Sequence, residues 1–147
     1  MVHDLIIVGA GPAVISTAVE AREAGIGRER ILILGKGPAH SYAIRKFYPE
    51  DKRVDAVYKG IPAISEGRIT IVDGTKQQTL DFLDQTIQRW ELNVQYDEGA
   101  RTIHKHDDRQ LFDVSTGKAS YQARVAAMRV ICRDYLDCPI PAGPQPA

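Results

Sequence analysis

The sequence has little cysteine, no excess of charge of either sign and no long apolar run. Nineteen basic and nineteen acidic side chains cancel in the 147 residues, which argues against nucleic acid or a membrane surface as the main partner. No apolar run approaches the roughly 18 residues that span a membrane. Asp4 and the glycines after residue 8 interrupt the apolar start, which does not match a signal peptide. We therefore expect a cytoplasmic protein of one domain, without nucleic-acid or membrane partners.

Cysteine and histidine are too sparse for a recognised redox or zinc site. Cys132 and Cys138 have five residues between them, whereas a redox pair is spaced C-x-x-C, so we expect plain thiols. None of the four histidines has a zinc-ligand spacing. His104 and His106 would share one face of a strand, but no acidic or thiol partner has a matching position. We predict no metal site, and no side chain stands out as a catalytic acid, base or nucleophile.

A glycine turn organises the N-terminal part of the chain. Residues 4–8 are mostly apolar, Gly9 and Gly11 follow, residues 12–24 form an amphipathic pattern, and residues 31–34 are apolar again. This order predicts a strand, a tight turn, a helix and a parallel return strand. In such a unit the first glycine makes the turn and the second lets a pyrophosphate approach the backbone. The helix N-terminus then offers N–H groups to the phosphate oxygens.

Two positions depart from the dinucleotide-binding fingerprint. The third small residue is replaced by Val14, and the acidic residue that would hold the ribose is replaced by Gly35. Overpacking by a branched side chain at position 14 would cost about 1–3 kcal/mol or displace the turn. Loss of the carboxylate would remove hydrogen bonds worth roughly 1.5–3 kcal/mol. Acting together, the two changes would weaken binding by about two to four orders of magnitude.

The middle of the chain predicts a surface excursion and a helix. Residues 35–64 are locally basic with interleaved aromatic side chains, so they form either a surface excursion with aromatic anchors or a loop that lines a ligand crevice. Residues 69–72 are a short strand or part of the same excursion. Thr79 is the expected N-cap of a helix over residues 79–91, because apolar side chains then recur at helical spacing on one face.

The last third of the chain predicts strands and a terminal tail. Strands are expected at five places: residues 92–96, 100–106, 111–114, 119–125 and 128–132. The third and fourth of these form a hairpin. Four prolines crowd residues 139–147, which predicts a disordered tail after a domain formed by residues 1–138.

A family resemblance rests on four stretches: DLIIVGAGPAVISTAVEAREAGI at 4–26, ILILGKG at 31–37, TLDFLDQTIQRWELNV at 79–94 and LFDVSTGKASYQARV at 111–125. In this order the chain resembles the N-terminal FAD-binding segment of the pyridine nucleotide-disulfide oxidoreductase superfamily, in particular its thioredoxin reductase-like and bacillithiol-disulfide reductase-like flavoproteins. The resemblance implies an α/β, Rossmann-like FAD/NAD(P)-binding domain. Such a domain has a parallel sheet with helices and a small β-hairpin or meander layer.

The resemblance also implies a cofactor site and an activity. Eight residues take cofactor-binding positions: Gly9, Ala10, Gly11, Pro12, Ala13, Val14, Gly35 and Lys36. The implied activity is that of an FAD- and NAD(P)H-dependent oxidoreductase. However, the chain has no second glycine fingerprint, no C-x-x-C and no final Gly-Asp segment. We therefore expect an FAD-binding module that is truncated or degenerate, with no catalytic residue of its own.

Two alternatives stay open. The first alternative to an FAD-binding module is a non-catalytic binding or interaction protein that keeps the fold without the cofactor. The second is an NADP(H)-binding Rossmann domain. The second is favoured by Gly35, which removes the carboxylate that would repel a 2′-phosphate, and by Lys36 or Arg45 as a cation for that phosphate. An incomplete module leaves apolar surface to be covered, so we also expect a homodimer or a partner chain that supplies the missing segments.

Overall fold

The computed structural model describes residues 1–70 and 72–128 of the chain. Several predictions fall outside these residues: the strand beyond residue 128, the states of Cys132 and Cys138, the domain boundary at residue 138 and the tail over residues 139–147. They stay predictions.

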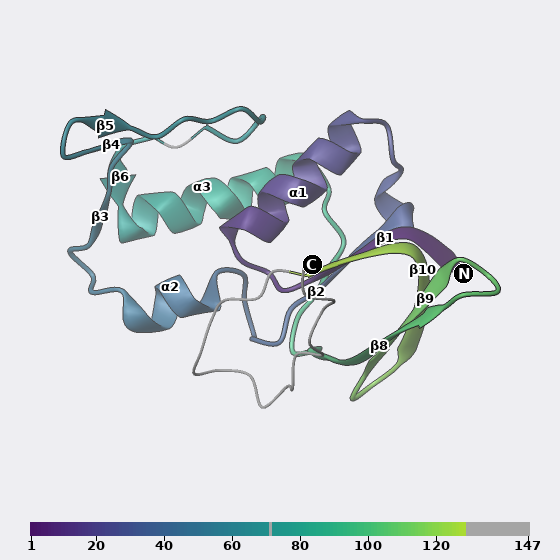
Figure 1. Cartoon of the computed structure of the whole chain (residues 1–147). Helices are drawn as coiled ribbons and strands as arrows, with labels where there is room; N and C mark the ends of the chain where they lie inside the picture. The colour runs from purple at the N-terminus through teal and green to yellow at the C-terminus, as the bar shows by residue number, and fades with distance from the viewer. Residues whose placement is uncertain (71, 129–147) are drawn as a thin grey trace, which may run out of the picture.

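A sheet of six strands forms the centre of the protein, in the order β7-β2-β1-β10-β9-β8 (Figure 1). Its strands are β1 (Val2–Val8), β2 (Ile31–Leu34), β7 (Val94–Gln95), β8 (Ala100–His106), β9 (Leu111–Thr116) and β10 (Ser120–Met128). The first four strands in the spatial order are parallel; β9 pairs antiparallel with β10, and β8 pairs antiparallel with β9. This arrangement confirms the Rossmann-like sheet with a small meander that the resemblance implied.

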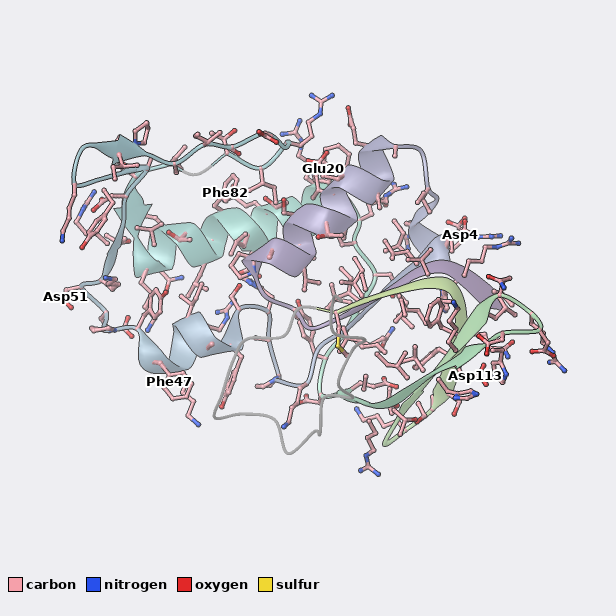
Figure 2. All side chains as sticks on the ribbon, in the orientation of Figure 1. Asp4, Glu20, Phe47, Asp51, Phe82 and Asp113 are labelled. Carbon is pink, nitrogen blue, oxygen red and sulfur yellow. The ribbon has the colours of Figure 1, made fainter. Side chains whose placement is uncertain are left out.

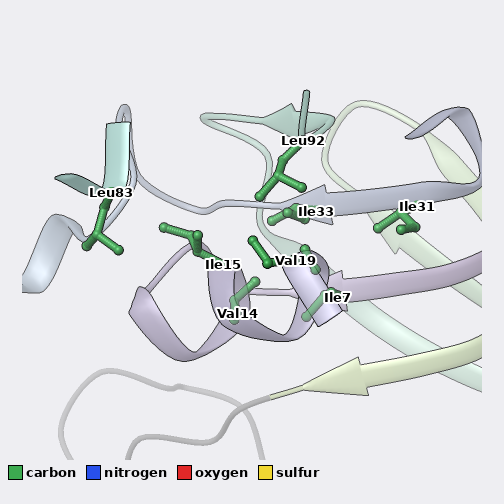
Figure 3. Packing of buried hydrophobic residues seen from close by; sticks show 9 residues of the cluster. Ile7, Val14, Ile15, Val19, Ile31, Ile33, Leu83 and Leu92 are labelled. Atoms are coloured by element: carbon green, nitrogen blue, oxygen red, sulfur yellow. The ribbon is translucent and has the colours of Figure 1, made fainter. Parts of the chain in front are cut away.

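Helices α1 (Pro12–Glu23) and α3 (Lys76–Arg89) pack on one face of this sheet. Figure 3 shows the core between α1 and the sheet, where Val19 of α1 lies near Ile33 of β2 and Ile7 of β1. A second apolar cluster uses alternate residues of β1 and β2 together with Val114 of β9 and Ala123 of β10. Because both faces of the parallel strands are buried, β1 and β2 need continuous apolar runs rather than alternating ones.

Helix α3 begins earlier than the sequence predicts. Its N-cap is Thr75, whose side chain accepts a hydrogen bond from the backbone N–H of Gln78, while the Gln78 side chain accepts one from the backbone N–H of Thr75. The prediction that Thr79 caps the helix was therefore wrong. Thr79 lies inside the first turns, where its hydroxyl donates to the Thr75 carbonyl at 3.0 Å. The capping box, together with the helix formers Lys76 and Gln77, extends the helix toward its N-terminus, beyond the apolar stripe that begins at Leu80.

The long connection between β2 and α3 is a surface excursion with more regular structure than expected. It contains α2 (Tyr42–Phe47), β3 (Arg53–Val54), β4 (Val57–Tyr58), β5 (Ile61–Pro62) and β6 (Gly74–Thr75). Strand β3 pairs with β6, and β4 pairs with β5. Residues 69, 70 and 72 lie in no strand.

The aromatic residues of this excursion do not anchor it in the core. Tyr42, Phe47 and Tyr58 are 44%, 50% and 68% exposed. Figure 2 shows Phe47 on the side of α2 that faces away from α3. The ammonium group of Lys46 lies 5.8 Å from the centre of the Tyr42 ring and 5.2 Å from that of Phe47. Such contacts between cations and rings stabilise exposed aromatic side chains without burying them.

The strands after α3 follow the prediction with two differences. Strand β8 has the predicted bounds, whereas β7 is limited to two residues. Met128 is the last residue of β10 rather than the first residue of a new strand, because β10 continues beside β1 as far as the pair Val8 and Met128. In residues 1–70 and 72–128, no helix combines the length and the apolar character needed to cross a membrane.

Candidate functional site

The glycine turn joins the carboxyl end of β1 to the first residue of α1. Gly9 has a φ of +113°, which residues with a side chain rarely adopt, and its N–H donates to the carbonyl of Leu34 at 2.8 Å. Gly11 is the N-cap of α1, with φ −86° and ψ 175°, and Pro12 is the first helical residue. The turn therefore lies at the carboxyl ends of β1 and β2, the edge of an α/β sheet at which ligands bind.

The N-terminus of α1 has the properties of an anion-binding site. Gly11 contributes no side-chain cap, and no acidic residue lies in the first turn of the helix. Among residues 1–70 and 72–128, no atom beyond the adjoining backbone lies within 4 Å of a β-carbon built on Gly11, so none of these residues fills the space in front of the turn. The first N–H groups of a helix have no acceptor within the helix and lie at the positive end of its dipole. Pro12 has no N–H, so the donors available to a phosphate group are the backbone N–H groups that follow it, beginning with Ala13.

Val14 packs into the core without displacing the turn. Its side chain is 4% exposed and belongs to the cluster between the helices and the sheet (Figure 3). A β-carbon on Gly9 would lie 3.3 Å from Cγ2 of Val14, so the missing side chain of Gly9 makes room for the valine. The hydrogen bond from Gly9 to Leu34 is kept. Of the two predicted alternatives, the displacement of the turn by Val14 is therefore wrong, and the loss of FAD affinity that depended on it no longer follows.

Gly35 lies directly against the glycine turn. It is buried, its N–H donates to the carbonyl of Gln95 at 2.8 Å, and its own carbonyl accepts from the N–H of Glu98 at 2.8 Å. A β-carbon at this position would lie 3.0 Å from Cβ of Ala10. Two of the predicted cofactor-binding residues, Ala10 and Gly35, thus lie against each other, and they leave little room for an acidic side chain at position 35. Lys36, the next residue, is exposed.

A polar cluster beside the turn was not predicted. We call it the His40 cluster; its members are His40, Ser41, Arg45, Asp84 and Tyr96. The Nε2 atom of His40 lies 2.9 Å from Oδ1 of Asp84 and 2.7 Å from Nη2 of Arg45. The Nδ1 atom of His40 lies 3.0 Å from Oγ of Ser41. His40 and Ser41 are 1% and 3% exposed. These residues come from separate parts of the chain, so spacing in the sequence gave no signal for the cluster.

Burial controls the protonation of this cluster. It lowers the pKa of His40, and Arg45 lowers it further, while the carboxylate of Asp84 opposes both effects. Burial also raises the pKa of the Tyr96 hydroxyl. His40 is consequently neutral at neutral pH. A neutral ring has one nitrogen that accepts a hydrogen bond and one that donates, which matches a donor in Arg45 and a hydroxyl in Ser41.

The two neighbouring histidines of β8 do have an acidic partner, contrary to expectation. Asp113 of β9 faces His104 in the strand pairing, and its Oδ2 lies 2.5 Å from Nε2 of His106. Hydrogen bonds from His106 and Gln122 hold the pKa of Asp113 below its usual value. The prediction missed this partner because the register of β8 on β9 was unknown. Among residues 1–70 and 72–128, no three or more His, Cys, Asp or Glu side chains are grouped to hold a metal ion.

The sequence model of the family described as pyridine nucleotide-disulphide oxidoreductase matches residues 6–128. The chain belongs to this family. No curated protein sequence matches it. The match begins within β1 and includes the glycine turn, both large helices and the meander, which are the elements that carried the predicted resemblance.

Solved structures support the same relationship. Bacillithiol disulfide reductase from Staphylococcus aureus is 25% identical, with a TM-score of 0.67 over 87% of this chain and 38% of its own. The corresponding enzyme from Bacillus cereus is 22% identical, with a TM-score of 0.68 over 87% of this chain and 39% of its own. Thioredoxin reductase from T. acidophilum is 22% identical, with a TM-score of 0.60 over 85% of this chain and 34% of its own.

The chain spans about two-fifths of the length of these proteins. Family and fold together confirm the prediction of a Rossmann-like nucleotide-binding module of oxidoreductase type. The complete reaction of a longer enzyme does not follow from this match.

Proposed function

We propose that the chain is the FAD-binding module of a thioredoxin reductase-like, NAD(P)H-dependent flavoprotein oxidoreductase. One observation carries the proposal: residues 9–12 make a glycine turn at the N-terminus of α1 that no other side chain of residues 1–70 and 72–128 fills, in a member of the pyridine nucleotide-disulphide oxidoreductase family. The flavin, when bound, accepts a hydride and passes electrons to the acceptor. The chain itself supplies binding and orientation.

Backbone groups would hold most of the cofactor. Gly9 shapes the turn, and Gly11 with the N–H groups of the first helical turn would meet the pyrophosphate. Gly35 and Lys36 lie where the adenosine ribose is expected, without a carboxylate for its hydroxyls. Because Val14 leaves the turn in place, only the missing carboxylate weakens binding. That loss amounts to about one to two orders of magnitude in affinity relative to a site that keeps the carboxylate.

Substitution at Gly11 tests the proposal directly. Within the part of the chain that the structure describes, an alanine there meets no atom within 4 Å beyond the adjoining backbone. Its backbone angles are ordinary, so we expect the fold to be kept, while the methyl group enters the space that the pyrophosphate needs. We expect saturable FAD binding to the unmodified chain and at least a tenfold loss in Gly11→Ala, followed by flavin fluorescence. Gly117→Ala, in the turn between β9 and β10, is the control. Its β-carbon would meet only the end of the flexible Arg101 side chain, at 2.9 Å, which can move away, so this variant should bind FAD normally. A folded chain that binds no FAD refutes the proposal and favours a protein that keeps the fold without the cofactor.

NADP(H) binding is the second candidate, because the residue after β2 has no carboxylate to repel a 2′-phosphate. Arg45 is engaged with His40 and Asp84, so exposed Lys36 is the better placed of the two predicted cations. A titration should then show preference for NADPH over NADH, and Lys36→Gln should reduce that preference about tenfold. Equal affinity for both nucleotides excludes this candidate.

The partner and the location remain predictions. A homodimer, or a partner chain that completes the enzyme, would cover exposed apolar residues, which sedimentation of the purified chain can test. A cytoplasmic location is expected from the sequence and needs fractionation of cells.

A further inference from the structure

The His40 cluster is connected to the glycine turn by one short backbone hydrogen bond. The N–H of Ser41 donates to the carbonyl of Ala10 at 2.7 Å. Ser41 has φ 52° and ψ 38°, a left-handed conformation that a residue other than glycine adopts only when its surroundings hold it. The contacts that fix the conformation of Ser41 therefore also fix the carbonyl of Ala10. Ala10 belongs to the turn that would surround the pyrophosphate.

Arg45 and Asp84 hold this segment from two helices. The Nε of Arg45 donates to the carbonyl of His40 at 2.8 Å, and its backbone N–H donates to the carbonyl of Ser41 at 3.0 Å. Asp84 of α3 reaches the same place, with Oδ1 2.9 Å from Nε2 of His40 and Oδ2 3.5 Å from Nη2 of Arg45. Helices α2 and α3 are thus tied to the glycine turn through residues 40 and 41.

One ring nitrogen of His40 has two neighbours of opposite charge. Neutral Nε2 accepts a hydrogen bond from Arg45, in which case it offers nothing to Asp84. Protonated Nε2 donates to Asp84 and repels Arg45. The titratable or charged groups that face the ring are Arg45 from α2, Asp84 from α3 and Tyr96 from the segment after β7. Uptake of one proton therefore exchanges the partner of the ring and removes one of the contacts that hold Arg45.

The order hydroxyl, imidazole, carboxylate also occurs in hydrolases, but this cluster does not have their geometry. Ser41 is 3% exposed and is held by the residue next to it in the chain, so its hydroxyl offers no access to a substrate. The cluster reaches the proposed ligand site through the backbone of Ala10 instead.

We propose that His40, Arg45 and Asp84 are positioning residues of the cofactor site, which hold the glycine turn through Ser41 and loosen it when His40 takes up a proton. This inference rests on the proposed function, because FAD affinity is its measure. It adds a dependence of binding on pH that the turn alone would not have.

Titration of the full chain with FAD between pH 8 and pH 5 tests this inference. We expect the dissociation constant to rise roughly tenfold toward pH 5, the size of one lost hydrogen bond. His40→Gln stays neutral and can still accept from Arg45, so its dissociation constant should change less than twofold over the same range. His106→Gln removes another histidine with a carboxylate partner, but from the β8–β9 pair, and should keep the full pH dependence.

Asp84→Asn gives a second measurement that does not depend on replacing a buried side chain. Asp84 is half exposed, and its charge favours the protonated ring. The asparagine variant should therefore fold, and its loss of affinity should begin at a lower pH. A flat profile for the unmodified chain, or an unchanged profile in both Asp84→Asn and His40→Gln, overturns the inference and leaves FAD binding intact. Absence of FAD binding at pH 8 overturns the proposed function and this role together.

Discussion

Replacing Gly35 by alanine tests how closely the end of β2 and the glycine turn depend on each other. The added carbon would lie 3.0 Å from Cβ of Ala10 and 3.5 Å from both the Gln95 carbonyl oxygen and Cδ1 of Tyr96. Both backbone polar groups of Gly35 are hydrogen-bonded, so the strand end cannot easily move away. Overpacking of this kind costs about 1–3 kcal/mol, and the stiffer unfolded chain returns about 0.4–1 kcal/mol. We expect a net loss of about 1–2 kcal/mol in the free energy of unfolding.

A double-mutant cycle with Ala10→Gly isolates this contact. Ala10→Gly alone should cost about 0.5–1 kcal/mol through the added freedom of the unfolded chain. Combined with Gly35→Ala it should recover most of the steric cost, so the two changes are not additive and couple by about 1 kcal/mol. Urea unfolding of the four proteins measures the coupling. If the effects of the two substitutions simply add, the contact between Ala10 and Gly35 does not limit what position 35 can hold.

The same cycle decides how the ribose carboxylate can be restored. Gly35→Glu in the unmodified chain should destabilise the fold and fail to improve FAD affinity. In the Ala10→Gly background the glutamate has room, and affinity should rise about tenfold or more if the ribose lies there. FAD titration of both variants makes the comparison, and equal gains in the two backgrounds would contradict the steric argument.

Three further predictions concern stability. Val14→Ala should lower the free energy of unfolding by about 2–3 kcal/mol without strengthening FAD binding, because the valine side chain fills the core. A tenfold gain in FAD affinity at unchanged stability would contradict this prediction. Thr75→Ala should cost about 1 kcal/mol in urea unfolding, and Thr79→Ala clearly less, since only Thr75 caps α3; equal losses would place the cap elsewhere. The urea concentration at the unfolding midpoint should fall as the pH drops below 6.5. Burial lowers the pKa of His3 and His40 in the folded protein, so the unfolded chain binds more protons in this range. A midpoint that rises or stays constant as the pH falls would refute this pH dependence.

The parts of the fold that local patterns determine were predictable. The apolar runs at β1 and β2 and the glycines between them gave the βαβ unit, because burial on both faces and a positive φ leave direct traces in composition. The start of α3 was misplaced because two threonines four residues apart both resemble an N-cap. Only Thr75 has the glutamine three residues later that completes a capping box.

The parts that depend on tertiary contacts were not predictable from one sequence. His40, Arg45 and Asp84 meet only because α2 and α3 approach the same turn, so their positions in the sequence carry no common period. The room for Val14 likewise depends on the missing β-carbon of Gly9, five residues away but in the next element. Asp113 became the partner of His106 through the register of a hairpin. Each case needs the packing of one element against another.

The position of β10 has a consequence for how this protein is made. Residues 2–8 pair with residues 122–128, so the inner edge of β1 stays open until almost the whole described chain has been synthesised. At usual translation rates this takes on the order of ten seconds, during which an apolar strand with unpaired backbone groups is exposed. We therefore expect the chain to depend on chaperones more than its size suggests. Its yield in cells should respond to the rate of translation between β2 and β10.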